Sequence, residues 1–177
     1  MLTDPQKRAL LVLAKRAVMA QVAGSALTVV DAIALPDASG VFVTIKRGGA
    51  LRGCLGTLEN RRGLAHEVAR CAAESASDDP RFPPVTESEL PELTIEISVL
   101  GPLERIEPAP GGFTVGRHGL VVEHGARRGL LLPQVATEWG WTPEQFLCQT
   151  CHKAGLPLDA WRRGATVYRF AAEVFGE

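Results

Sequence analysis

Apolar and polar residues alternate along several stretches of the chain, and this period of two is typical of β-strands with one buried face. The clearest stretch is Leu93–Leu100, in which leucine, isoleucine and valine alternate with threonine, glutamate and serine. Val41–Lys46 and Leu51–Leu58 have the composition of two further strands, and Gly48-Gly49 between them is a turn sequence. The pattern therefore predicts a β-hairpin followed later by a third strand.

Apolar residues three and four positions apart predict two helices. The first spans about 4–23, and the second follows Gly63 and ends at about Ser77. Asp4-Pro5 is an N-cap signal for the first helix, and Thr142-Pro143 is the same signal for a later one. The remaining predicted elements are two or three short strands within 111–132, helices over 133–139 and 142–154, and a closing strand over 166–175.

Hairpins and single strands, rather than repeated strand-helix-strand units, favour an α+β fold with a mostly antiparallel sheet flanked by helices. Hydrophobic residues make up 46% of the chain and charged residues 22%, which excludes a largely disordered protein. There is no internal repeat and no linker-like segment. We therefore expect residues 1–177 to form a single domain.

The formal net charge is −1, so no overall field attracts the protein to nucleic acid or to an anionic membrane. The apolar run near the N-terminus is too short and too interrupted by charges for a signal peptide or a membrane span. Four cysteines without such a signal indicate reduced thiols and a cytoplasmic protein.

The predicted hairpin places a cysteine between two glycines, in the segment RGCLGT. A three-residue loop at 48–50 would set Thr44 opposite Cys54 and Lys46 opposite Arg52. This register keeps an apolar face together. The other face then holds Phe42, Thr44, Lys46, Arg52 and Cys54, with Gly56 beside the thiol.

Two interpretations of this face remain open. In the first, Arg52 stabilises a reactive Cys54 thiolate in a small anion-attracting pocket, and Glu96 is a base or the counter-charge of Arg52. The glycines would then clear space around the thiol. In the second, Cys54 is a small apolar residue that only packs, because cysteine is among the most buried residue types.

The proline-rich loop DDPRFPP has the same two interpretations. Asp79 can cap the turn, while Arg81 and Phe82 can present a cation and an aromatic ring to a ligand. Alternatively, the loop is a rigid connection held by a buried Phe82.

Cys148 to His152 read CQTCH, the pattern of covalent haem attachment. The segment lies inside a predicted helix, and a single CxxC pair does not supply the four ligands of a closed zinc site. We predict no metal and no cofactor.

Several segments in order resemble the AMMECR domain family, called AmmeMemoRadiSam system protein A in prokaryotes. They are LRGCLGT, DPRFPPVT, ELTIEISVL, VGRHGLVVEHGARRGLLLPQVATEWGW and TCHKAGLPLDAW. The signature residues carried over by this resemblance are Arg52, Gly53, Cys54, Gly56, Thr57, Asp79, Arg81 and Phe82. His152 stands where prokaryotic relatives commonly have tryptophan, so CQTCH is a coincidence of this chain.

The resemblance implies a larger and a smaller lobe, with a cleft near the hairpin. It also implies Memo or dioxygenase-like and radical S-adenosylmethionine proteins as partners in a modification pathway, with a nucleic acid among the candidate substrates. Our first hypothesis is an enzyme, or a subunit of one, that uses Cys54 with Arg52 and Glu96. Thr44, Lys46 and the other signature residues would bind the ligand. The rival is a non-catalytic adaptor or a module that binds a ligand or nucleic acid.

Overall fold

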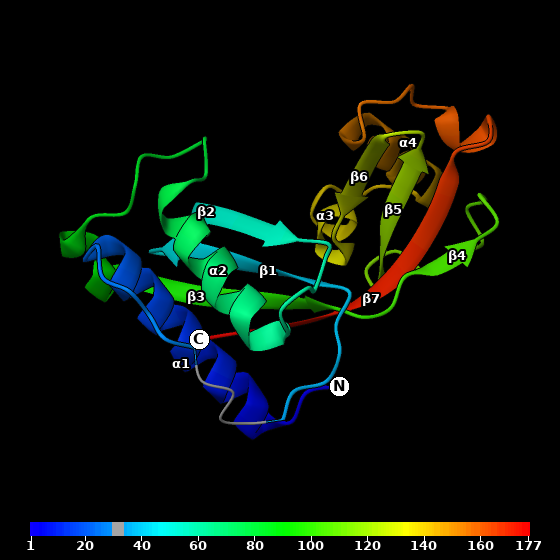
Figure 1. The fold of residues 1–177 in the computed structure, drawn as a ribbon. Helices are drawn as coiled ribbons and strands as arrows, with labels where there is room; N and C mark the ends of the chain where they lie inside the picture. The colour runs from blue at the N-terminus through cyan, green and yellow to red at the C-terminus, as the bar shows by residue number, and fades with distance from the viewer. Residues whose placement is uncertain (30–33) are drawn as a thin grey trace. The chain divides into compact units, whose positions relative to one another are not determined.

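The computed structural model describes residues 1–29 and 34–177, which divide into two compact units. The first unit comprises Met1–Leu100 with Glu173–Glu177, and the second comprises Gly101–Ala172. Figure 1 shows the helices and strands of both units along the chain. Each unit has its own hydrophobic core.

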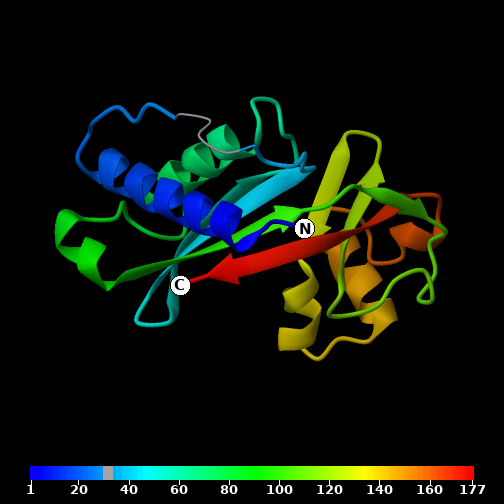
Figure 2. The same cartoon turned by 90° about the horizontal axis from the view of Figure 1, so that it is seen from below.

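The first unit has two helices on one face of an antiparallel sheet. Its elements are α1 (Asp4–Val22), β1 (Gly40–Arg47), β2 (Ala50–Thr57), α2 (Leu64–Ser77), the 3₁₀ helix η1 (Glu87–Glu92) and β3 (Leu93–Leu100). The strand order is β2-β1-β3, and the end of β7 (Thr166–Gly176) follows β3. Both helices pack together over these strands, as Figures 1 and 2 show.

The buried face of this sheet follows from the alternation in the sequence. Val41, Val43 and Ile45 of β1 are fully buried, and the residues opposite them on β3 are buried as well. Leu10 and Val68 bring the apolar faces of α1 and α2 onto them. The opposite face of β1 carries half-buried side chains.

The second unit is also a mixture of antiparallel strands and helices. Its elements are β4 (Glu104–Ile106), β5 (His118–His124), β6 (Arg127–Leu131), α3 (Pro133–Glu138), α4 (Pro143–Lys153), the 3₁₀ helix η2 (Ala160–Arg162) and the first residues of β7. The strand β5 pairs with both β6 and β7, and β4 pairs with β7. Phe146 and Leu147 of α4 are fully buried in this core.

The predicted α+β fold with a mostly antiparallel sheet is therefore confirmed. The N-cap of the first helix lies one residue earlier than predicted: it is Thr3, and Asp4 is the first residue of the helix. The Thr3 hydroxyl accepts a hydrogen bond from the Gln6 amide, and the Gln6 side chain accepts one from the Thr3 amide in return. Neither η1 nor β4 was among the predicted elements.

Candidate functional site

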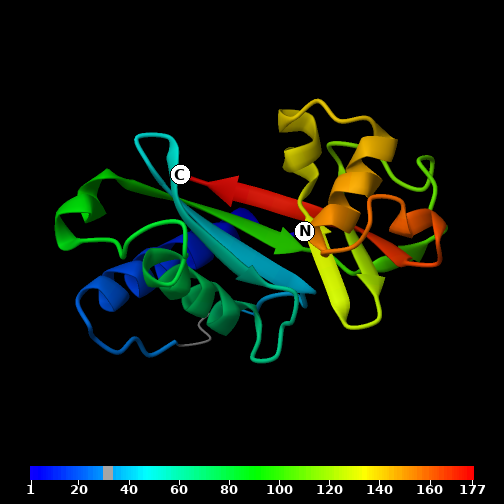
Figure 3. The ribbon, with the colours of Figure 1, turned by 90° about the horizontal axis from the view of Figure 1, so that it is seen from above.

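Figure 3 shows the strands β1 and β2 joined by a short turn. Their residues pair as predicted in the middle of the hairpin, and the pairing differs next to the turn. Thr44 lies opposite Cys54, but Lys46 lies opposite Leu51 rather than Arg52. The turn is the two-residue pair Gly48-Gly49, with φ of 57° and 81°. Both values lie in the left-handed region that favours glycine, and two-residue hairpin turns use it.

Arg52 is the extra residue of a β-bulge, and this corrects the predicted register. The three-residue loop was expected because it would place Leu51 on the apolar face and keep Arg52 apart from Val43 and Ile45. In the structure Leu51 is 42% exposed, so its burial contributes little to the choice of register. Lys46 and Arg52 are consequently not opposed cations that share an anion.

The two glycines beside Cys54 make room for parts of this protein. A Cβ at Gly53 would lie 2.1 Å from the backbone oxygen of Ser75 in α2, and a Cβ at Gly56 would lie 2.4 Å from the Phe42 ring. Both distances are shorter than any tolerable contact. The expectation that the glycines clear space around the thiol is therefore wrong.

The Ser75 side chain of α2 forms hydrogen bonds with the backbone of both β1 and β2. It donates to the Val43 carbonyl and accepts from the Leu55 amide, each at 2.8 Å. Val43 and Leu55 are opposite one another in the hairpin, so one buried hydroxyl satisfies a backbone group on each strand. No local signal in the sequence pointed to this residue.

The Arg52 side chain is hydrogen-bonded to the segment that follows α2. Its guanidinium binds the carboxylate of Glu89 through Nε (2.9 Å) and Nη2 (3.1 Å), and Nη1 and Nη2 donate to the carbonyls of Pro83 and Pro84. The hydrogen bonds from Arg52, followed by those from Thr86, lower the pKa of Glu89 to about 2. The counter-charge of Arg52 is thus Glu89, not Glu96 as the sequence analysis suggested.

Glu89 could have been found from the sequence. Thr86 and Glu89 have the spacing of a capping box, and the structure forms it at the start of η1. The Glu89 carboxylate accepts from the Thr86 amide at 2.8 Å, and it also contacts Arg47. This carboxylate therefore links η1 to both strands of the hairpin.

Asp79 holds the proline-rich loop against β2. Its side chain is almost completely buried and accepts hydrogen bonds from the Cys54 amide (2.9 Å) and from the Arg81 guanidinium (2.7 Å). The Arg81 guanidinium, together with these amide donors, holds the pKa of Asp79 well below its usual range. Arg81 also donates to the Cys54 carbonyl, so both backbone groups of Cys54 are bound by this loop.

Phe82 and Thr57 complete the signature residues. The Phe82 ring lies near two guanidinium groups, 6.0 Å from Arg52 and 5.6 Å from Arg81. The Thr57 hydroxyl exchanges hydrogen bonds with the backbone of Glu59 at the end of β2. Each of these side chains contacts its own chain and stabilises the local fold.

The Cys54 side chain is half-buried on the sheet face opposite α1 and α2. The Thr44 hydroxyl donates a hydrogen bond to its sulfur at 3.2 Å. Thr44 lies opposite Glu96 on β3, so Cys54, Thr44 and Glu96 form one row across three strands. Lys46 is the next residue of β1 on this face, and its ammonium binds Glu96 at 2.9 Å.

Two strand spacings separate Cys54 from Glu96, which is about 10 Å between their backbones. A proton would pass between them through Thr44, a water molecule or a bound substrate. The row therefore offers a thiol with a hydroxyl donor beside it and an ion pair at its far end.

The other cysteines differ in exposure. Cys71 and Cys151 are fully buried, and burial raises the pKa of both thiols, that of Cys71 to about 12. Cys148 is half-buried, as Cys54 is. Within residues 1–29 and 34–177, no group of three or more His, Cys, Asp or Glu side chains is placed to hold a metal ion.

Three cavities formed by described residues of the first unit are lined by residues other than Cys54. One, of about 380 Å³, is lined by Thr57 with arginines and glutamates that follow β2. A second lies between α1 and α2, and the third between α1 and the η1–β3 segment. Among the described residues, no helix has the length and apolar character to cross a membrane.

The chain is similar to a known protein family and to several proteins of that family. A family model described as AMMECR1 matches residues 11–175. A protein of Methanothermobacter thermautotrophicus is 51% identical over 153 residues, which are 81% of this chain and 80% of that protein. Protein TK0174 of Thermococcus kodakarensis is 52% identical over 148 residues, which are 78% of this chain and 72% of that protein.

Among solved structures, the crystal structure of the uncharacterized protein PH0010 from Pyrococcus horikoshii is similar, with a TM-score of 0.87 and 44% identity. The match covers 96% of this chain and 90% of that chain. The protein is thus an α+β protein with a half-buried, glycine-flanked cysteine on the sheet face opposite α1 and α2. It belongs to the AMMECR1 family.

Proposed function

We propose that Cys54 is a reactive thiol and that this protein is a modification enzyme, or a subunit of one, that uses it as a nucleophile or covalent carrier. The observation that carries the proposal is the hydrogen bond from the Thr44 hydroxyl to the Cys54 sulfur. A hydrogen bond donated to sulfur favours the thiolate, which is the nucleophilic form of cysteine.

In this proposal Thr44, and not Arg52 as in the first hypothesis, assists Cys54. Arg52 is engaged by Glu89 and two carbonyls, so in this proposal Arg52 braces the hairpin while Thr44 stabilises the thiolate. Glu96 and Lys46 bind or orient a substrate at the far end of the row, and Glu96 exchanges protons with that substrate.

The family resemblance extends the proposal to partners. In this proposal the protein acts in a cytoplasmic modification pathway with a Memo or dioxygenase-like protein and a radical S-adenosylmethionine protein, the partners that the resemblance implies. A thiol subunit suits such a pathway because a covalent carrier can hold an intermediate between two active sites.

Site-resolved alkylation tests the proposal. The native protein is treated with iodoacetamide at pH 7, and the label on each of the four cysteines is followed over time by mass spectrometry. Cys148 is the matched comparison because it is also half-buried, while Cys71 and Cys151 report any loss of the native fold. We expect Cys54 to react at least about tenfold faster than Cys148.

A rate at Cys54 equal to that of Cys148, or labelling only in denaturant, would contradict the proposal. It would favour the rival function, a binding module whose thiol only packs. The observation that favours this rival is that Arg52, Asp79 and Arg81 all bind their own chain. If nucleic acid is the ligand, its affinity should fall steeply as salt rises, and no binding at low salt would exclude it.

A further inference from the structure

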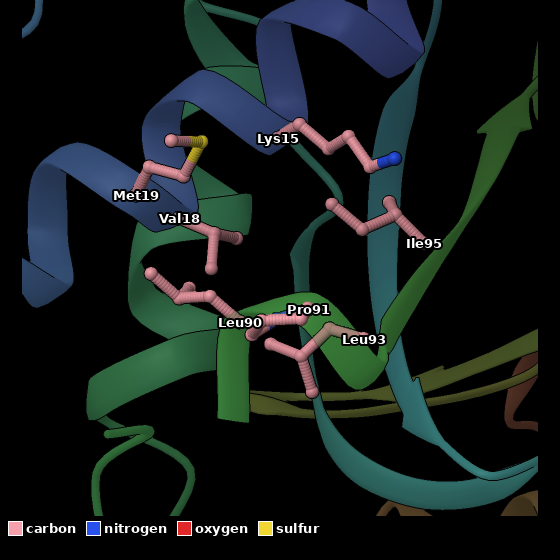
Figure 4. A pocket seen from close by; sticks show the side chains of 7 residues that line it. All are labelled: Lys15, Val18, Met19, Leu90, Pro91, Leu93 and Ile95. Atoms are coloured by element: carbon pink, nitrogen blue, oxygen red, sulfur yellow. The ribbon is translucent and has the colours of Figure 1, made fainter. Parts of the chain in front are cut away.

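A cavity of about 380 Å³ lies between α1 and the η1–β3 segment, on the other side of the first unit's sheet from Cys54. Figure 4 shows side chains of α1 and of η1–β3 pointing toward one another around it. Its walls are mostly apolar, and Lys15 is the charged residue among them. The apolar residues of its walls are Val18, Met19, Leu90, Pro91, Leu93 and Ile95.

The outer side of α1 continues this apolar surface beyond the cavity. Val12 and Met19 are 58% and 55% exposed, and they are seven positions apart, which is two turns of the helix. Figure 2 shows α1 in front of the sheet. A surface helix usually presents polar residues outward, so exposed apolar residues beside an apolar cavity indicate a contact surface.

Cations lie along the same side of α1. Arg8, Lys15 and Arg16 are exposed and share the helical face of Val12 and Met19. Lys15 binds the Glu177 carboxylate at 2.6 Å, and its side chain is still half exposed. Arg8 and Arg16 make no ion pair within residues 1–29 and 34–177. The contact surface therefore combines apolar side chains with three cations, of which Lys15 borders the cavity.

We propose that this surface binds an amphipathic α-helix of a partner protein, with acidic residues on both sides of its apolar stripe. One apolar side chain of the partner enters the cavity between Val18 and Leu93, and the next contacts Val12. This is recognition of a helix by a groove, in which anchors repeat at i, i+3, i+4 and i+7. Carboxylates flanking the anchors bind Arg8, Lys15 and Arg16, and the charges select acidic over basic partners.

The proposal does not depend on thiol chemistry at Cys54, because the two surfaces lie on opposite faces of the sheet. It can therefore be tested whether or not Cys54 proves reactive. The cations distinguish an acidic helix from a small apolar ligand. An uncharged aliphatic ligand would need the cavity but would not need Arg8 or Arg16.

Methionine labelling gives a sharp readout, because the chain has two methionines, Met1 and Met19. The full-length protein with ¹³C-labelled methionine methyl groups is titrated with a synthetic helical peptide of about 18 residues. The peptide has leucines at i, i+4 and i+7 on one face, flanked by glutamates. We expect the Met19 methyl signal to shift saturably, while the fully exposed Met1 signal stays in place.

Matched controls separate the charge from the apolar contact. A peptide with lysine at every glutamate should leave the Met19 signal unchanged. The Arg8→Glu/Arg16→Glu variant leaves the cavity intact and should bind the acidic peptide about tenfold more weakly. Val12→Ser should weaken binding as well. All three positions are exposed, so circular dichroism is expected to show unchanged folds.

Four results would overturn the proposal. The Met19 signal could fail to move with the acidic peptide at millimolar concentration, or could move equally with the basic one. It could respond instead to octanoate with the same affinity in the wild type and in Arg8→Glu/Arg16→Glu, which would make the cavity a small-molecule site. A Met19 shift that follows protein concentration without peptide would make the surface a contact between two copies of this chain.

Discussion

The guanidinium of Arg52 binds both oxygens of the Glu89 carboxylate and so joins the bulge of β2 to η1. The two side chains are only 13% and 11% exposed. Planar two-point pairing of this kind is available to arginine and not to lysine. The signature arginine of the hairpin is therefore a structural brace in this protein.

Replacing Arg52 by alanine should destabilise the protein by about 3 kcal/mol, because it leaves a largely buried carboxylate without its main partner. The free energy of unfolding in urea measures this. Arg61→Ala is the matched control, since Arg61 pairs with Glu59 in a well-exposed position and should contribute at most about 1 kcal/mol. Equal losses in the two variants would contradict the role assigned to Arg52.

Gly53→Ala should cost about 3 kcal/mol or more, because its Cβ would meet the Ser75 backbone oxygen and α2 would have to move. Gly111→Ala is the control, since a Cβ at that position meets nothing within 4 Å. We expect the control to stay within about 0.5 kcal/mol of the wild type in urea unfolding. A Gly53→Ala protein of wild-type stability would mean that α2 does not pack this closely.

Stability should fall in acid because Glu89 titrates at lower pH in the folded protein than in the unfolded chain. Its pKa falls from the usual 4.5 to about 2 on folding. Above pH 4.5 the carboxylate is ionised in both states, so its stabilising contribution is fully present. As pH drops from 4.5 toward 2, the unfolded chain takes up the proton first and the contribution is lost.

The Glu89→Gln variant isolates this contribution. It should be less stable than the wild type at pH 7, and its stability should decline less between pH 4.5 and 2.5. Urea midpoints measured across this range give both curves. If the two curves run parallel, Glu89 does not carry the acid sensitivity. Asp79 acts in the same direction, because its pKa is also lowered on folding.

Thr44→Val should slow alkylation of Cys54 about threefold to tenfold at pH 7. The variant keeps the shape of the side chain and removes the hydroxyl that donates to sulfur, which disfavours the thiolate. Thr94→Val is the control, because Thr94 lies on the same face of the sheet, opposite Lys46. An unchanged Cys54 rate in Thr44→Val would remove the main support for a reactive thiol.

The fold was predictable where the pattern of burial is regular. Leu93–Leu100 forms the strand that its alternation indicates, and Thr44 meets Cys54 because both lie in the regular middle of the hairpin. At the turn the same reasoning was wrong. It used a longer loop to keep Arg52 apart from Val43 and Ile45. In the structure Arg52 is instead the extra residue of a bulge and is held by Glu89, a carboxylate 37 residues away in the sequence.

The candidate site shows the same limit. The sequence placed Cys54 beside two glycines, but their purpose depends on how α2 and Phe42 pack over the hairpin. Ser75 was missed for this reason, since nothing near it in the sequence indicates that its hydroxyl reaches two strands. Contacts between distant segments decide these roles, and a single sequence does not display them.

The hydrogen bonds between the proline-rich loop and the backbone of Cys54 protect the protein against aggregation. β2 is the outermost strand of its sheet, and an outermost strand can recruit the strand of another molecule and begin aggregation. Asp79 and Arg81 occupy the amide and the carbonyl of Cys54, which an incoming strand would need. The proline-rich loop thus shields the middle of β2 from pairing with other chains, and it does so through the backbone of Cys54 and not through its thiol.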